Sequence, residues 1–278
     1  MYATGSSGPP AWRCALVTGA SSGIGLAIAE RLAADRVNLV LVARRAEVLG
    51  QVSARLSRFG VSIEVLVADL AELPDRDRVG ARLADPANPV DLLVNCAGAG
   101  LAGPLIGQPA GQRRREAELN CVSVLGLCHA AASSMVPRGH GTIINVGSGL
   151  GFYPFPGAAV YAASKAFVCT MTAALRYELR NTGVRVTLVA PGPTRTAAAG
   201  KAGVNLRRLP GFLIASPERV AAAALAAARA NRAVEQVSPW NRMMTLGRFA
   251  PARLTQPAMA RIFRRFTGQQ LDSATPTS

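Results

Sequence analysis

Six short apolar runs, separated by longer amphipathic stretches, constrain the fold of this 278-residue chain more than any other feature. Each run is nearly all apolar and is bounded by Gly, Pro or polar residues, which is typical of strands that are buried on both faces of a sheet. The runs cover residues 14–18, 38–42, 63–68, 90–94, 141–146 and 184–190, and 233–238 is a weaker seventh candidate.

Helical periodicity occupies the stretches between those runs. These stretches lie at 24–35, 46–59, 75–84, 113–135, 159–181 and 216–231. Regular alternation of strand and helix predicts right-handed βαβ crossovers and a single parallel sheet. We therefore predict an α/β fold, a Rossmann-type doubly wound parallel sheet in three α/β/α layers. Such a sheet binds its ligand at the carboxyl ends of its strands, so the residues that follow each strand form the candidate site.

Three segments make up the predicted domain organisation. Residues 1–12 are a flexible leader, 13–238 form one Rossmann-fold domain with a candidate lid at 194–213, and 239–278 form a basic C-terminal helical extension.

The extension carries an amphipathic pattern. Apolar side chains recur there at i, i+3, i+4 and i+7: Met259, Ile262, Phe263 and Phe266. Three basic side chains fall on the opposite side: Arg261, Arg264 and Arg265. This pattern predicts a basic amphipathic helix. Three roles stay open for it: packing on its own domain or on a dimer mate, peripheral attachment to anionic lipid, and a flap over a substrate channel.

Composition narrows the class of protein. Half of the residues are hydrophobic and 17% are charged, which excludes a disordered chain. No run of eighteen consecutive apolar residues occurs, so we expect no membrane-spanning helix. The first twelve residues lack the features of a signal peptide, and we expect a cytoplasmic protein, with peripheral membrane contact as the alternative. Five cysteines without a CxxC and only two histidines predict neither a disulfide framework nor a metal site.

The net charge of +15 is unevenly distributed. Residues 1–100 carry ten basic and ten acidic side chains, whereas residues 201–278 carry twelve and three. Such an excess suits an acidic partner or substrate, an anionic membrane, or merely solvated arginine-rich faces. Neither a zinc finger nor interleaved aromatic and basic residues accompany it, so we predict no nucleic-acid partner.

The sequence TGASSGIG at residues 18–25 connects the first predicted strand to the first predicted helix. Glycines at this place allow a tight turn and let backbone N–H groups approach a diphosphate at the positive helix N-terminus. The candidate cofactor-binding residues of the turn are Gly19, Ser21, Ser22, Gly23, Ile24 and Gly25. The spacing TGxxxGxG resembles the fingerprint of the short-chain dehydrogenase/reductase family.

The end of the second predicted strand indicates which nicotinamide cofactor is bound. An acidic residue there would bind the ribose 2′-hydroxyl of NAD, whereas arginine suits the 2′-phosphate of NADP. The chain has Arg44 and Arg45 at this position and no Asp or Glu. We therefore predict NADP(H), with Arg44 as the phosphate ligand and Arg45 stacked on the adenine. The alternative is a solvated pair at the start of a helix.

Further motifs that resemble those of the family follow in the same order, and the resemblance spans residues 14–196. It implies cofactor contacts from Asp69 and Leu70, from Asn95, Ala97 and Gly98 in a variant of NNAG, and from Pro191, Gly192, Thr194 and Thr196 in PGxxxT. Cys96 stands where the family usually has asparagine, and we interpret it as a packed side chain rather than a nucleophile.

Tyr161 and Lys165 form a YxxxK motif, and their i, i+4 spacing places both on one helix face. Lys165 is one of only two lysines, which favours a chemical role for its ammonium. The resemblance adds Ser148 and Asn120 to the catalytic set. It implies that Tyr161 donates a proton, Lys165 stabilises the phenolate and binds the cofactor, Ser148 polarises the carbonyl, and Asn120 holds a water that resupplies the proton.

Motifs constrain the segments expected to bind the substrate less than those expected to bind the cofactor. Phe152 and Tyr153 precede Pro-Phe-Pro-Gly, and Lys201, Arg207 and Arg208 lie in the predicted lid. An apolar pocket with a basic mouth suits a hydrophobic ketone, lipid-, steroid- or polyketide-like, free or linked to CoA or an acyl carrier. The motifs and tail resemble the ketoacyl and hydroxysteroid reductase branch, which implies a homodimer or homotetramer.

We therefore predict NADPH-dependent reduction of a hydrophobic ketone to an alcohol. Two alternatives are the reverse reaction, as an NADP-dependent alcohol dehydrogenase, and a non-catalytic NADP(H)-sensing or membrane-associated binding module on the same scaffold.

Overall fold

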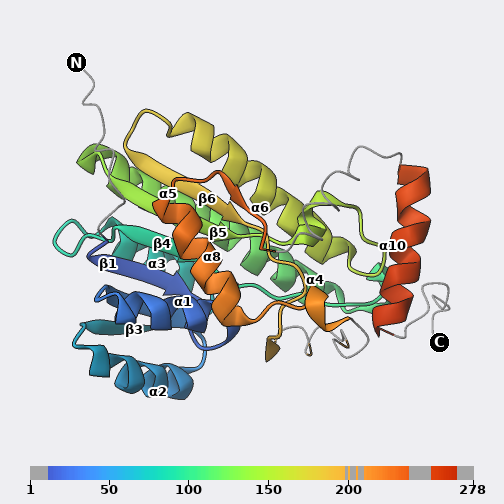
Figure 1. The fold of residues 1–278 in the computed structure, drawn as a ribbon, viewed down its shortest axis with the longest axis horizontal. Helices are drawn as coiled ribbons and strands as arrows, with labels where there is room; N and C mark the ends of the chain where they lie inside the picture. Colours follow the sequence, from blue (N-terminus) through green and yellow to red (C-terminus); the bar gives the residue numbers. More distant parts are fainter. Residues whose placement is uncertain (1–11, 198–199, 201–204, 206–209, 238–251, 268–278) are drawn as a thin grey trace.

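The computed structural model describes residues 12–197, 200, 205, 210–237 and 252–267. Seven parallel strands form one sheet in the order β3-β2-β1-β4-β5-β6-β7 (Figure 1). The strands are β1 (Cys14–Thr18), β2 (Asn38–Ala43), β3 (Ile63–Val67), β4 (Leu92–Asn95), β5 (Gly141–Val146), β6 (Val184–Val189) and β7 (Val234–Glu235). All six predicted runs are strands, and the weaker seventh candidate forms the short edge strand β7.

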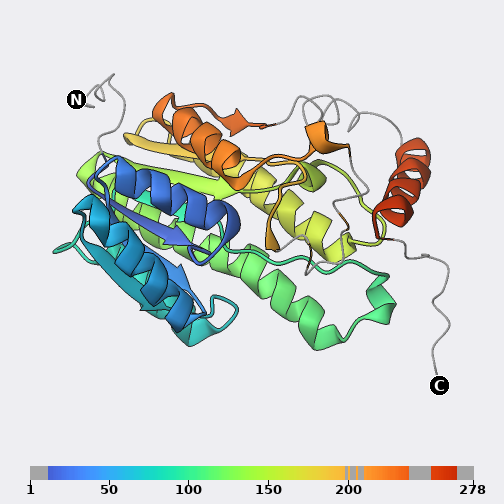
Figure 2. The ribbon, with the colours of Figure 1, turned by 60° about the horizontal axis from the view of Figure 1, so that its bottom comes forward.

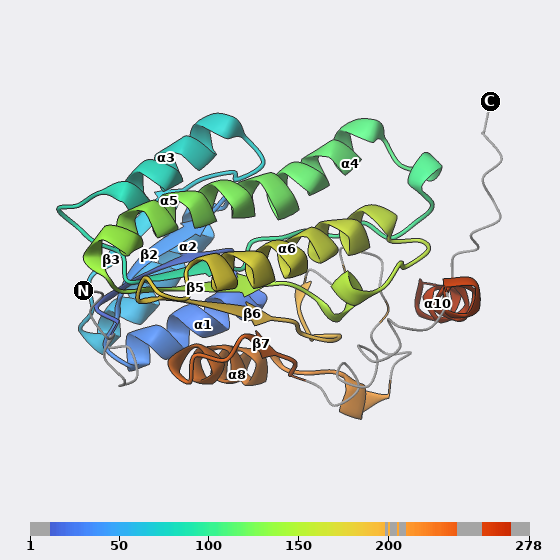
Figure 3. The ribbon, with the colours of Figure 1, turned by 90° about the horizontal axis from the view of Figure 1, so that it is seen from above.

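Helices cover both faces of the sheet, which confirms the three-layer α/β/α fold class. The longer helices of the domain are α1 (Gly23–Ala34), α2 (Ala46–Leu56), α3 (Leu73–Ala84), α4 (Ala110–Ala117), α5 (Ser123–Arg138), α6 (Ala159–Glu178) and α8 (Pro217–Arg229). Figure 3 shows α3, α5 and α6 on one side of the sheet and α1 and α8 on the other. The strand order reverses between β1 and β4, so a cofactor site is expected above that pair.

The central strands contribute side chains to two hydrophobic cores, one on each face of the sheet. In β1, Ala15 and Val17 pack on the side of α1, whereas Leu16 packs on the side of α3 and α5, and all three are fully buried. A strand covered on both faces offers no side chain access to water, so apolar residues predominate and a polar one needs a partner within the protein. This double burial explains why the strand sequences are almost continuously apolar.

The predicted helix at 113–135 differs from the observed one. It runs from Ala110 to Arg138 as α4 and α5, joined by a π-helical segment at Glu118–Val122. A π turn inside a helix is rare and frequently lies at a functional site. Asn120 lies in this segment and is fully buried.

By length and composition this helix could cross a membrane, contrary to our expectation from the sequence. Leu127, Ala131 and Met135 are nevertheless buried in the core cluster that also includes strand residues. We therefore interpret it as a core helix of an α/β domain, because its apolar side chains have a partner within the fold.

The predicted amphipathic helix of the extension is present as α10 (Ala252–Thr267). It lies apart from the three layers, at the end of the molecule where α6 begins (Figures 1 and 2). Met259 and Phe263 are buried against Phe155 and the start of α6, while Arg261, Arg264 and Arg265 are exposed. Packing on its own domain is thus the role that the structure supports for the described part of the extension. The side chain of Phe266 lies outside the described residues.

Candidate active site

The turn between β1 and α1 has a shape that only glycine permits at three places. Gly19 and Gly23 have φ of 69° and 59°, in the left-handed region. A Cβ at Gly19 would lie 3.0 Å from backbone atoms of Ala97, and one at Gly25 would lie 2.5 Å from the Gly19 carbonyl oxygen. The turn therefore lies tightly against the end of β4. Ser21 and Ser22 lead into α1, and Ile24 lies in its first turn. This is the arrangement that the sequence predicted for binding a diphosphate.

Thr18 fixes this turn to the loop after β4, a role that the sequence analysis missed. Its Oγ1 donates to the Val94 carbonyl (3.2 Å) and accepts from the backbone N–H groups of Cys96 (2.9 Å) and Ala97 (3.0 Å). Ala97 and Gly98 are thereby held beside the glycine turn. The position of Thr18 directly before the first glycine was the available signal.

Asn95 does not present its side chain to the cofactor side. It is buried, and its Nδ2 donates to Asn145 Oδ1 (2.9 Å) and to Cys128 Sγ (3.3 Å). Asn145 in turn donates to Thr172 Oγ1 (2.9 Å). The side chain of Asn95 therefore links β4 to β5 and α5 from within, and through Asn145 to α6. Its backbone remains for the cofactor contact, which stays a prediction.

Arginines gather where the adenosine end of the cofactor is expected. Arg45 donates to Ser21 Oγ (3.1 Å), and Arg44 Nη1 lies 3.6 Å from Asp69 Oδ2. Arg115 of α4 also bonds to Asp69 and to Glu72. Arg115 was not predicted, because it does not follow a strand and only the fold brings α4 to this place.

Leu70, also predicted to contact the cofactor, lies at this end of the site as well. It follows Asp69 at the end of β3, but its side chain is buried in the core beneath α3 and α5. Only its backbone remains for the cofactor contact that the sequence predicted.

The YxxxK pair lies in the first two turns of α6. Lys165 is buried, its Nζ donates to the Val146 carbonyl (2.9 Å), and it lies 5.9 Å from the centre of the Tyr161 ring. Ser148, two residues beyond β5, accepts from the Leu150 N–H (3.2 Å) through its Oγ, which leaves its O–H available as a donor. A Cβ at Gly98 would lie 3.4 Å from Lys165 Nζ, so the loop after β4 passes close to the ammonium.

Asn120 is tied to the protein rather than open to a ligand. Its side-chain amide forms two hydrogen bonds with the backbone of Ala99, and its Nδ2 also donates to Ser164 Oγ (3.0 Å). The side chain therefore joins the loop after β4 to α6. The water-holding role implied by the resemblance would fall to the backbone of Asn120.

The segment after β6 returns to the glycine turn. Gly149 donates to the Pro191 carbonyl (3.0 Å), and Thr194 Oγ1 donates to the Gly192 carbonyl (2.9 Å). A Cβ at Gly23 would lie 3.1 Å from Thr196 Cγ2, so Thr196 borders the turn. Lys201, Arg207 and Arg208 of the predicted lid lie outside the described residues.

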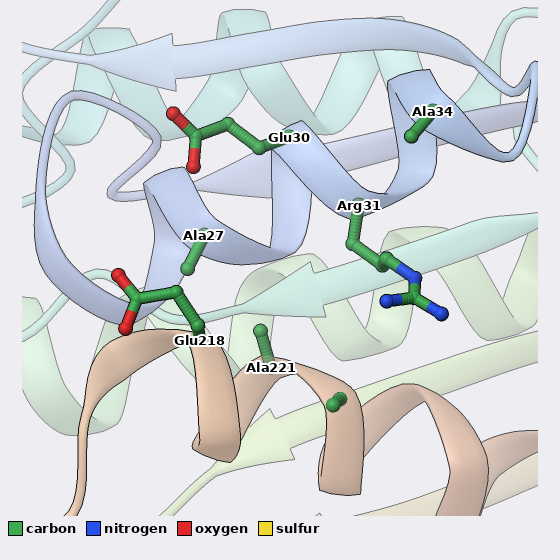
Figure 4. A pocket seen from close by; sticks show the side chains of 7 residues that line it. Ala27, Glu30, Arg31, Ala34, Glu218 and Ala221 are labelled. Carbon is green, nitrogen blue, oxygen red and sulfur yellow. The ribbon is translucent and has the colours of Figure 1, made fainter.

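A shallow pocket between α1 and α8 is distinct from this site (Figure 4). Small side chains line it, with Glu30, Arg31 and Glu218 around them, and none of the predicted catalytic or cofactor-binding residues takes part. In the part of the chain that the structure describes, no three His, Cys, Asp or Glu side chains are placed to hold a metal ion.

Cys96 lies beside the site, and its environment supports the interpretation as a packed side chain. Burial raises the pKa of its thiol to about 12, and the nearby Lys165 ammonium opposes this only in part. Burial likewise raises the pKa of Cys128 to about 11. Because the thiolate is the reactive form, neither should react as a nucleophile at neutral pH.

We expect iodoacetamide at pH 8 to leave Cys96 and Cys128 unmodified in the native protein. Mass spectrometry of peptides from the native and the denatured, reduced protein measures this, and the denatured sample is the control in which all five cysteines react. Rapid native labelling of Cys96 would contradict its assignment as a packed thiol.

Comparison with known proteins agrees with the motifs. The family model described as short chain dehydrogenase matches residues 13–206. A short-chain dehydrogenase from Sphingobium yanoikuyae, solved in complex with NADPH, is 33% identical with a TM-score of 0.78, over 95% of this chain and 99% of that one. The bulky-bulky ketone specific alcohol dehydrogenase from Comamonas testosteroni is 34% identical with a TM-score of 0.74, over 83% and 90%.

A curated relative has a different length. The glycine betaine reductase of Emericella nidulans is 35% identical over 69% of this chain, which spans only 15% of that much longer protein. The family match, the fold and the order of the motifs agree, and the chain belongs to the short-chain dehydrogenase/reductase family of nicotinamide-dependent oxidoreductases.

Proposed function

We propose that this protein reduces the carbonyl of a hydrophobic ketone to an alcohol with NADPH. The observation that carries the substrate class is an apolar cluster that touches Tyr161. Phe155, Ala158 and Ala162 pack with Met259 and Phe263 of α10, and Tyr161 and Leu150 pack against this group. The rings of Phe155 and Phe263 meet edge to face, 6.2 Å between centres. Wherever a substrate carbonyl meets Tyr161, an apolar wall is therefore close by.

The residues of the chain fit a nicotinamide cofactor. The close approach of Gly19 and Gly25 leaves room for a diphosphate at the N-terminus of α1, and Lys165 lies beside Gly98, where a ribose would be held. Arg44 and Arg45 at the end of β2 favour a 2′-phosphate. The bound cofactor would supply the hydride that adds to the carbonyl carbon.

Three side chains would handle the proton and the oxygen. Tyr161 is proposed to donate its phenolic proton to the carbonyl oxygen as negative charge develops there. Lys165, a buried cation 5.9 Å from the Tyr161 ring, stabilises the phenolate that remains. Ser148 donates a hydrogen bond to the same oxygen, a contribution of about 3 kcal/mol to transition-state stabilisation.

The function is tested by following NADPH consumption with a panel of ketones that runs from short polar to two-ring aryl compounds. We expect turnover that rises with hydrophobic size. Tight NADPH binding without turnover of any ketone, and without oxidation of the matching alcohols with NADP, would favour the non-catalytic sensing module instead. Faster oxidation than reduction at equal saturation would favour the alcohol dehydrogenase direction.

Phe263→Ala is expected to lower kcat/KM for a two-ring aryl ketone about tenfold, because Phe263 supports the apolar wall beside Tyr161 from behind and small misplacements near the reacting groups have effects of at least this size. A short polar ketone should lose much less, since it does not reach the wall. Phe263→Leu keeps an apolar side chain and serves as the conservative control. Equal losses for both ketones would show that the wall does not contact the substrate.

We further propose that the protein is a homodimer or homotetramer that assembles through α5 and α6. Both helices carry exposed apolar side chains on their outer faces: Leu125 is 50% exposed, Tyr177 67% and Phe167 38%. A second copy of the chain would cover these faces, because paired apolar helix faces are what four-helix packing buries. Leu125→Glu should shift the protein towards monomer in sedimentation analysis.

A cytoplasmic location is also part of the proposal. Met259 and Phe263 are occupied by contacts within the domain, so among the side chains of α10 that the structure describes, the exposed arginines are the ones that would attach it to lipid. Such attachment would be lost at high salt.

A further inference from the structure

A buried ion pair lies on α4, outside the set of residues that the family resemblance assigned. The side chains of Arg113 and Glu116 are 7% and 1% exposed, and Arg113 Nη1 donates to Glu116 Oε2 at 3.2 Å. The two residues are one helical turn apart, so they face the same direction. The segment that they face is the loop after β4.

Both charged groups hold this loop by its backbone. Arg113 donates to the carbonyls of Leu101 (2.9 Å) and Gly103 (3.3 Å), and Glu116 Oε1 accepts from the Leu101 N–H (3.4 Å). We call Leu101–Gly103 the clamped loop. It continues from Gly98 and Ala99, which border Lys165 and Asn120.

The clamped loop reaches Tyr161 from one side. A Cβ at Gly100, the residue just before the loop, would lie 2.8 Å from Tyr161 Cδ2, so the backbone there passes directly against the ring. A displacement of this backbone would move the ring or leave it unsupported, because close-packed atoms cannot shift independently.

The loop also supports the apolar wall. Gly103 donates to the Gly157 carbonyl (2.7 Å), and Ala102 packs against the cluster formed by Phe155 and Phe263. Gly157 has φ of 84°, and a Cβ there would lie 2.5 Å from the Phe263 ring. The position of α10 on the domain is therefore linked to the clamped loop through this backbone hydrogen bond and through the packing of Ala102.

Stability alone gives a weak reason for such a pair. Transferring two charges out of water often costs more free energy than their mutual attraction returns. Proteins with apolar replacements of similar volume are frequently as stable or more stable. The position of the pair is costly in another respect, since the buried Nε of Arg113 has no hydrogen-bond partner. Burial also raises the pKa of Glu116, although Arg113 and the Leu101 N–H oppose this.

We propose that Arg113 and Glu116 are positioning residues, which clamp the loop after β4 so that the Tyr161 ring and the apolar wall are held in place for the reaction. Neither touches the reacting atoms. The proposal rests on the proposed function for its kinetic consequence, but the clamp itself is a property of the folded chain and can be measured without a substrate.

The principal test replaces both charges at once, Arg113→Met with Glu116→Leu. We expect the melting temperature to fall only modestly, because no unpaired charge remains although the backbone of Leu101 and Gly103 loses its side-chain partners. Hydrogen exchange of the Leu101 and Gly103 amides should accelerate. The kcat for the best ketone of the panel should fall about tenfold to a hundredfold, since small misplacements of catalytic groups have effects of this size. The NADPH dissociation constant should not change.

Two further variants make the result interpretable. Glu116→Gln keeps the shape of the side chain and one hydrogen-bond acceptor, so we expect its kcat to lie between those of the wild type and the double variant. It provides the kinetic test if the double variant does not fold. Arg55→Met with Glu30→Leu removes an exposed ion pair on α1 and α2 (45% and 39% exposed) and should leave kcat and the loop exchange unchanged.

Wild-type kcat in a double variant with accelerated loop exchange would overturn the proposal, because the loop would then be irrelevant to Tyr161. Unchanged exchange of the Leu101 and Gly103 amides would overturn it as well. If the wild type reduces no ketone, the proposed function fails, whereas the exchange measurement still decides whether the clamp exists.

Discussion

Tyr161→Phe is expected to lower kcat by about three orders of magnitude while NADPH binds almost as tightly as to the wild type. Phenylalanine keeps the ring that packs against Gly100 and the apolar cluster, so the structure around α6 should not change. It lacks the hydroxyl that would give a proton to the carbonyl oxygen. The measurement is single-turnover consumption of NADPH with the best ketone of the panel, together with fluorescence titration of NADPH.

The control for this variant is Tyr177→Phe on the same helix. Tyr177 is 67% exposed and its ring faces the Arg180 guanidinium, far along α6 from the site. Its replacement should leave kcat within experimental error. Retention of a tenth of the wild-type rate by Tyr161→Phe would refute the assignment of Tyr161 as the proton donor.

Arg44→Ala is expected to weaken NADPH binding about tenfold to a hundredfold and to leave NADH binding nearly unchanged. Hydrogen bonds to charged groups contribute about 1.5–3 kcal/mol, and only NADPH carries the 2′-phosphate that such a bond would reach. Arg44 can give up Asp69 for the 2′-phosphate, because its contact with Asp69 is long at 3.6 Å and its side chain is 61% exposed. Fluorescence titration with both cofactors measures the effect.

Arg115→Ala and Arg45→Ala separate the contributions of the other two arginines. Arg115 is paired with Asp69 and Glu72, so its loss should alter NADPH affinity less than the loss of Arg44. Arg58→Ala, in the turn Ser57–Phe59 that follows α2, is the matched control for removing one positive charge. Equal affinities of the wild-type protein for NADPH and NADH would remove Arg44 from its proposed role.

The catalytic pair illustrates what local spacing can predict. Tyr161 and Lys165 are separated by four residues within one helix, so their proximity follows from helix geometry and needs no knowledge of the rest of the fold. The glycine turn is predictable for the same reason, since the left-handed backbone at Gly19 and Gly23 restricts the residue type locally.

Side chains whose partners lie far away in the chain could not be predicted in this way. Asn95 is the first residue of a motif that the resemblance predicts to contact the cofactor, yet its side-chain amide bonds to Asn145, fifty residues later. Arg115 reaches Asp69 across forty-six residues. In both cases the preferred partner is decided by which strand and helix ends meet.

The amino-acid sequence by itself determined the alternation of strands and helices, the turn at the end of β1 and the residues at the strand ends, because these depend on burial periodicity and on the backbone conformations that neighbouring residues allow. Only the tertiary structure decided that Arg113 and Glu116 hold the loop beside Tyr161, and that Phe263 packs on Gly157 to bring α10 to the same site. These contacts join segments that are distant in sequence, and their formation depends on the close packing of whole elements, which no local pattern encodes.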